Sequence, residues 1–109
     1  MGLTHANVML QNTGDVALCR RNMIGEDEIR SLEINCLVDT SAMTMVINEE
    51  IRQALGLPII GERLSQLPDG RKMVLPLAGP IDIWYEDRLS TTNAVVMLDD
   101  NDPLLGVIP

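Results

Sequence analysis

Alternating apolar and polar positions predict several short β-strands along this chain. Near the N-terminus the apolar residues fall at every second position, at Ala6, Val8 and Leu10, with Asn7 and Gln11 among the residues between them. This period of two is typical of a strand with one buried face. The period recurs loosely in residues 29–39, 81–85 and 89–98, and residues 43–47 form a continuous apolar run that suits a buried strand.

The segment that follows the first strand has a less regular pattern. Residues 12–15 read Asn-Thr-Gly-Asp, which is a typical turn composition. We expect residues 16–21 beyond it to form a second strand or an extended loop. The pattern as a whole predicts a mostly β fold.

One helix is expected at about residues 48–55. Asn48 can cap its N-terminus, and Gly56 can end it. Ile51, Ala54 and Leu55 have the i, i+3, i+4 spacing that gives a helix a single apolar face.

A β-hairpin is expected at about residues 64–77. Its turn signal is Asp69-Gly70, which lies between two apolar arms. Gly79-Pro80 is expected to separate this hairpin from the next strand, because glycine and proline together interrupt regular structure.

Composition narrows the classes of function. The chain has 109 residues, of which 46% are apolar, and this indicates a single globular domain over residues 1–109. Its net charge of −8 argues against a nucleic-acid partner, because phosphates would be repelled. No apolar stretch approaches the roughly 20 residues that span a bilayer, and the N-terminus lacks the basic start of a signal peptide. We therefore expect a cytoplasmic protein without a membrane partner.

The reactive residue types exclude further chemistries. The chain has one histidine, which leaves no Ser-His-Asp or Cys-His nucleophile, and it has no Gly-rich phosphate loop. Cys19 and Cys36 form no CxxC pair and are expected to be free thiols. We expect neither a cofactor nor a metal.

One short segment carries candidate chemistry. Two apolar residues are followed by an acid, two small hydroxyl residues and an alanine, in the order Leu37-Val38-Asp39-Thr40-Ser41-Ala42. This pattern places a carboxylate at the mouth of a buried strand, where hydroxyl and backbone N–H groups can orient it by hydrogen bonds. The alternative is an ordinary turn in which Asp39 only caps the backbone.

The sequence resembles the retropepsin-like aspartic proteases, and in particular their small bacterial members. Three segments carry the resemblance, namely residues 37–42, the Asp69-Gly70 hairpin and Leu104-Leu105-Gly106. Their order and spacing are similar to the family's catalytic turn, flap and hydrophobic-hydrophobic-Gly segment. The resemblance implies a closed β-barrel lobe that carries half of an active site.

The resemblance also implies a role for each matching residue. Asp39 would be the catalytic aspartate, supported by Thr40, with Ser41 and Ala42 beside the substrate. The flap would close over a bound peptide; its residues are Leu67, Pro68, Asp69, Gly70, Arg71, Lys72 and Met73. Leu104, Leu105 and Gly106 would pack beneath the catalytic turn. Ser41 occupies a position where the family usually has glycine, and the family's C-terminal helix and interface strand are expected to be missing here.

Aspartate-dyad chemistry needs two carboxylates, and the chain contains one Asp-Thr-Ser segment. The second carboxylate must then come from another copy, so we expect a symmetric homodimer that hydrolyses a peptide or protein substrate. Two alternatives stay open at this point. One is a catalytically inactive lobe of the same fold that binds peptides or mediates self-association, and the other is a small β-barrel interaction domain.

Overall fold

The computed structural model describes residues 3–39, 45–66, 70–97 and 104–105. Seven strands make up most of this part of the chain, and two α-helices and one short 3-10 helix complete it. The strands are β1 (Leu3–Asn12), β2 (Ser31–Asp39), β3 (Met45–Asn48), β4 (Ile59–Gln66), β5 (Lys72–Tyr85), β6 (Arg88–Met97) and β7 (Leu104–Leu105). The helices are α1 (Thr13–Arg20), η1 (Glu26–Glu28) and α2 (Glu49–Leu55).

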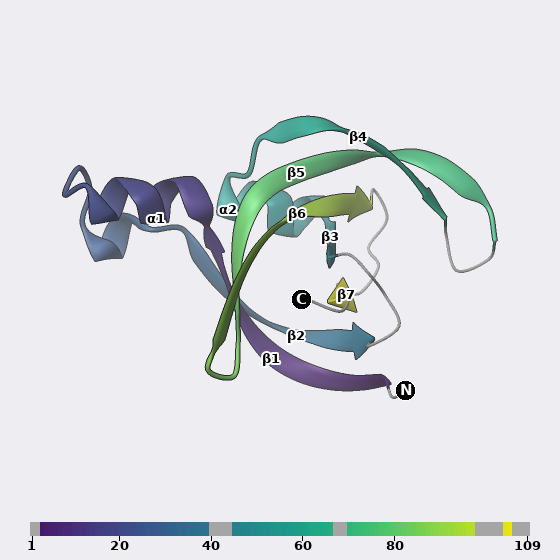
Figure 1. The fold of residues 1–109 in the computed structure, drawn as a ribbon, viewed down its shortest axis with the longest axis horizontal. Coiled ribbons are helices and arrows are strands. Elements are labelled where there is room, and N and C mark those ends of the chain that lie inside the picture. Colours follow the sequence, from purple (N-terminus) through teal and green to yellow (C-terminus); the bar gives the residue numbers. More distant parts are fainter. Residues whose placement is uncertain (1–2, 40–44, 67–69, 98–103, 106–109) are drawn as a thin grey trace.

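The strands pair in the order β1-β2-β7-β3-β6-β5-β4, and β1 also pairs with β5 (Figure 1). Most neighbours are antiparallel, whereas β7 runs parallel to β2 and β3 runs parallel to β6. The structure confirms the mostly β class. The closed barrel stays a prediction.

The core is built from residues of β1, β2, β3, β5, β6 and α2. Along β1 the expected alternation is confirmed, since Val8 and Leu10 are buried and Asn7 is exposed. The same cluster takes in Met45 and Ile47 from β3, as well as Cys36, Ile51, Leu55, Leu57, Ala78, Ile81, Ile83, Ala94 and Val96. Residues 45–47 of the continuous apolar run thus lie in a strand with one buried face, and residues 43–44 lie outside the described part.

Helix α2 confirms the predicted helix and its two end signals. The Asn48 Oδ1 atom accepts a hydrogen bond from the Ile51 backbone N–H at 2.8 Å. Gly56 follows the last turn with φ of 64°, a left-handed conformation that glycine adopts without a Cβ penalty. Ile51 and Leu55 are buried, so the helix packs on these two residues of its predicted apolar face. The inclusion of Ala54 in that face is wrong, because Ala54 is exposed.

Helix α1 is a correction to the sequence prediction. Residues 16–21 were expected to be extended, but Thr13–Arg20 is helical. The first of the turn-like residues, Asn12, is its N-cap, because the Asn12 Oδ1 atom accepts from the Asp15 backbone N–H at 3.1 Å. The other three, residues 13–15, form the first turn of the helix. The chain therefore has two α-helices in its described part, where one was expected.

The predicted hairpin is present in its two strands, β4 and β5. They pair antiparallel from Gln66↔Lys72 to Ile59↔Ala78, and the turn residues 67–69 lie outside the described part. The expected break at Gly79-Pro80 is wrong, because β5 continues through it to Tyr85. Proline lacks a backbone N–H, and here it sits where the β5–β6 register shifts between Ala78 and Ile81, so no regular ladder bond is lost.

The β4–β5 hairpin and α1 lie at opposite ends of the molecule (Figure 1). The hairpin curves away from the other strands as an arm, and its outer part extends beyond the end of β6. Among the described residues, no helix is long and apolar enough to cross a bilayer.

Candidate active site

Asp39 is the last residue of β2. Its backbone lies opposite Leu3 of β1, so the strand that carries the candidate carboxylate is held along one edge over its whole length. Three residues earlier, Cys36 is fully buried in the core. Asp39 therefore ends a strand that is anchored in the core, in agreement with the strand-end position predicted from the sequence.

Strand β7 lies between β2 and β3 at this same place. Leu104 and Leu105 pair in parallel with Leu37 and Val38, the two residues before Asp39. The other edge of β7 pairs antiparallel with Met45 and Val46, the first residues of β3. The chain thus brings together the residues just before the candidate turn, the residues just after it, and a segment more than sixty positions away.

The structure describes only some of the predicted site residues. Asp39, Leu104 and Leu105 are described in their backbone pairing, and Gly70, Arg71, Lys72 and Met73 belong to the outer part of the arm. The remaining predicted residues lie outside the described part, and these are Thr40, Ser41, Ala42, Leu67, Pro68, Asp69 and Gly106. The catalytic and flap roles stay predictions.

The arm carries exposed apolar side chains. Leu64 and Val74 lie directly opposite each other, and 65% and 57% of their surface is exposed. On the other face of the arm, Leu75 is buried and packs with Val95 of β6. One face of the arm is thus anchored to the sheet, and the other presents an apolar pair to solvent.

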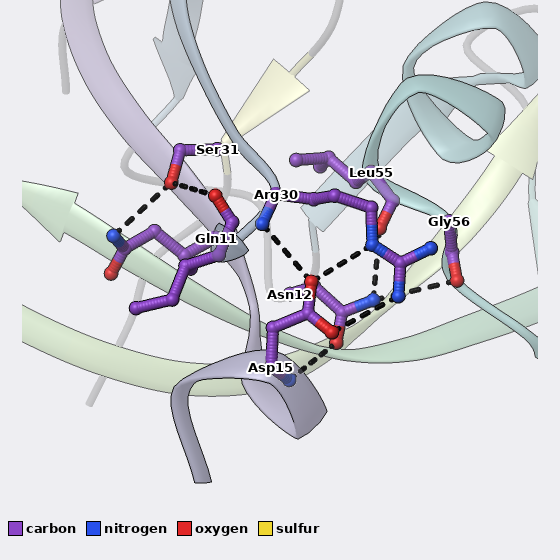
Figure 2. A network of polar contacts seen from close by, with 8 residues as sticks. Gln11, Asn12, Asp15, Arg30, Ser31, Leu55 and Gly56 are labelled. Atoms are coloured by element: carbon purple, nitrogen blue, oxygen red, sulfur yellow. Dashed lines mark hydrogen bonds and ion pairs between the residues drawn. The ribbon is translucent and has the colours of Figure 1, made fainter. Parts of the chain in front are cut away.

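A polar cluster around Asn12 was missed by the sequence analysis (Figure 2). The Asn12 Nδ2 atom donates to the Leu55 carbonyl oxygen at 2.9 Å, and so joins the end of β1 to the last turn of α2. Asp15 accepts two side-chain hydrogen bonds from Arg30, at 2.8 and 3.0 Å, and one from its backbone N–H. The signal that could have found it is an N-cap residue with an acid three positions later, the pattern of a helix start.

The polar cluster around Asn12 stabilises the fold. Asn12 and Asp15 are buried, and each polar group found there has a partner within the chain. Hydrogen bonds from the Arg30 side chain are the main cause that lowers the pKa of Asp15 below its ordinary value of 3.8, and burial opposes them. Asp15 is therefore held as a carboxylate by a fixed cation, and this stabilises the helix start rather than providing a reactive group.

Replacing Asp15 with Asn is expected to lower the free energy of unfolding by about 1–3 kcal/mol near neutral pH, because the Arg30 guanidinium loses a charged, paired acceptor. Since the folded-state pKa of Asp15 is lowered, its contribution is present above pH 3.8 and is lost as the pH falls below it. Denaturant unfolding at about pH 6 and about pH 3 should show the difference between wild type and variant shrinking in acid. Glu33→Gln, an exposed acid-to-amide change on β2, is the matched control.

A second buried carboxylate, Asp82 of β5, accepts hydrogen bonds from two hydroxyl groups. Its Oδ1 atom accepts from Thr13 Oγ1 at 2.7 Å and from Thr91 Oγ1 at 2.9 Å, so it ties α1 and β6 to β5. No group of His, Cys, Asp or Glu side chains suited to a metal ion occurs among the residues that the structure describes.

The comparisons with known proteins found similarity among solved structures. No family model matches the sequence, and no curated protein matches it. The chain is similar to the crystal structure of a retropepsin-like aspartic protease from Rickettsia conorii, at 14% sequence identity and a TM-score of 0.44. The match covers 98% of this chain and 79% of that protein.

Proposed function

We propose that this chain is one half of a homodimeric aspartic endopeptidase and that Asp39 is its catalytic carboxylate. The observation that supports the proposal best is the strand pairing around β7. It gathers Leu37-Val38, Leu104-Leu105 and Met45-Val46 at the one place where the chain leaves β2 through Asp39. A carboxylate that must keep its direction needs such a rigid base, because a loosely held acid loses the alignment that catalysis requires.

The chemistry requires a second copy of the chain. Two ionised carboxylates about 3 Å apart, at an effective dielectric constant near 20, repel by roughly 5 kcal/mol. The pair therefore shares one proton, as aspartic-protease dyads do, and the apparent pKa values belong to the pair. The ionised Asp39 takes a proton from a water between the two chains, that water attacks the peptide carbonyl carbon, and the protonated partner donates to the carbonyl oxygen. In the resulting tetrahedral intermediate, Asp39 passes its proton to the peptide nitrogen while the partner aspartate takes one back from a hydroxyl group. The C–N bond then breaks, and the dyad again holds one proton.

The arm formed by β4 and β5 is proposed to close over the substrate. It extends toward the end of the molecule at which β2 terminates in Asp39 (Figure 1). β4 is the last strand in the sheet order, so the backbone N–H and C=O groups along its outer edge are available to pair with another strand. An extended peptide could pair with such an edge through main-chain hydrogen bonds, while the exposed apolar side chains of the arm contact its side chains.

The test is digestion of an unstructured protein at mildly acidic pH, over a wide range of chain concentrations, with the solution mass measured in parallel. If two chains form the site, cleavage per mole of chain rises with concentration and levels off when the dimer is saturated. Cleavage strictly proportional to concentration by a monomer would contradict the shared dyad. A dimer that binds peptides without cleaving them would favour the inactive binding module.

A further inference from the structure

Trp84 lies on the outer face of the sheet, away from the core. It is 39% exposed, whereas its neighbour Ile83 is fully buried. Trp84 is directly opposite Met9 of β1, and its indole Nε1 donates to the Gln11 Oε1 atom on the same strand at 3.2 Å. The indole therefore extends across β1 instead of standing away from the sheet, and it presents part of its ring to solvent.

Amide and hydroxyl side chains continue this face from Trp84 across β1 to β2. Gln11 Nε2 donates to Ser31 Oγ at 3.2 Å, a bond drawn in Figure 2. Further along the same two strands, Asn35 Nδ2 donates to Asn7 Oδ1 at 3.0 Å. Each primary amide has two donors and an oxygen with two acceptor positions, so these cross-strand bonds orient the amides and leave further hydrogen-bonding capacity. We call Asn7, Gln11, Ser31, Asn35 and Trp84 the outer amide face.

Charge is sparse on this face. Between the pairs Asn7↔Asn35 and Gln11↔Ser31, the outward position of β2 is Glu33, and its partner on β1 is Met9. On these two strands Glu33 is thus the one charged side chain in this stretch, although the whole chain carries a net charge of −8. On β5, Asp82 lies opposite Gln11 on the same face, but its carboxylate is buried and accepts hydrogen bonds from Thr13 and Thr91. The described residues of β1 and β2 offer no Lys or Arg to an anionic ligand, and a cationic ligand would find a single exposed carboxylate. The complementary ligand is neutral and polar.

We propose that the outer amide face binds a neutral saccharide. The polarised C–H groups on one side of a pyranose ring suit the negative face of an indole. Sugar hydroxyls both donate and accept hydrogen bonds, as the amides and Ser31 do. Donors and acceptors on the protein and on the sugar can therefore all find partners. A proline-rich peptide offers mainly acceptors, and it would leave the Glu33 carboxylate and the amide oxygens without donors. The proposal is independent of Asp39.

Because Trp84 is the single tryptophan in the chain, its fluorescence reports on this face alone. The wild-type protein is titrated with cellohexaose, maltohexaose and N-acetylated chitohexaose, each up to about 10 mM. We expect a saturable change in emission with at least one of them, and the same change in the Asp39→Asn protein. The second result separates saccharide binding from peptidase activity.

Variants then locate the binding. Asn35→Ala and Gln11→Ala should each weaken the interaction about fivefold or more through the loss of hydrogen bonds. Trp84→Ala, followed by calorimetry, should abolish it. Leu64→Ala removes an exposed apolar side chain from the arm and should leave the affinity unchanged.

Three results would overturn the proposal. The first is emission that stays constant with all three oligosaccharides. The second is a response to a proline-rich peptide in their place. The third is an emission change that follows protein concentration alone, which would assign the face to contact between two copies of the chain.

Discussion

Asp39→Asn is expected to remove peptide hydrolysis and to leave the fold intact. Asparagine keeps the size of the side chain but can neither accept the proton of the attacking water nor share a proton with the partner aspartate. The expected loss in kcat is about 10²–10⁴-fold, the usual contribution of a general acid–base group. Because Asp39 ends β2 and its strand is held by backbone pairing with β1, the free energy of unfolding should change by less than about 1 kcal/mol.

The measurement is the initial rate of cleavage of an unstructured protein, combined with denaturant unfolding of both proteins. Asp87→Asn is the matched control, since it makes the same change at an exposed turn between β5 and β6. Cleavage that persists in Asp39→Asn would reject the catalytic role. Extensive unfolding of the variant would show instead that the carboxylate supports the fold, as an Asp that caps a turn would do.

Mixing wild-type and Asp39→Asn chains tests the same prediction in a second way. If chains exchange between tight dimers, an equal amount of Asp39→Asn chain captures half of the wild-type chains in mixed dimers. The cleavage rate should then fall to about half of its original value. A site contained in one chain would be unaffected by the addition.

The sequence was sufficient to predict those elements that depend on residues close together in the chain. The helix cap at Asn48, the glycine at position 56 and the alternation in β1 all act within a few residues, and the structure shows each as expected. The two strands of the hairpin also follow from a short-range turn signal. In these segments, propensity, patterning and capping agree with the final fold.

The elements that sequence reasoning missed depend on distant partners. Helix α1 has little apolar pattern of its own, and it is held by Asp15, whose cation lies fifteen residues later at Arg30. The insertion of β7 between β2 and β3 joins segments that no local pattern connects, and only the family resemblance led us to expect Leu104 and Leu105 near the segment of Asp39. Of the candidate site, the sequence predicted the place of Asp39 at a strand end; the described residues do not include the turn that follows it.

Leu10→Ala is expected to have the largest effect on stability. Leu10 is fully buried and lies opposite Leu32 of β2 on one side and Ile83 of β5 on the other. Strands on both sides restrict how far the site can collapse, so the substitution leaves a cavity as well as removing buried apolar surface. The expected loss in the free energy of unfolding is about 2–5 kcal/mol.

The matched control is Leu64→Ala, the same change at a side chain that is 65% exposed on the arm. Thermal unfolding at one fixed chain concentration should lower Tm by about 10 °C or more for Leu10→Ala, and by a few degrees at most for Leu64→Ala. Equal effects of the two substitutions would mean that the side chain of Leu64 is covered in solution. Since a second chain or the closed arm could cover it, the comparison also probes the dimer on which the proposed dyad depends.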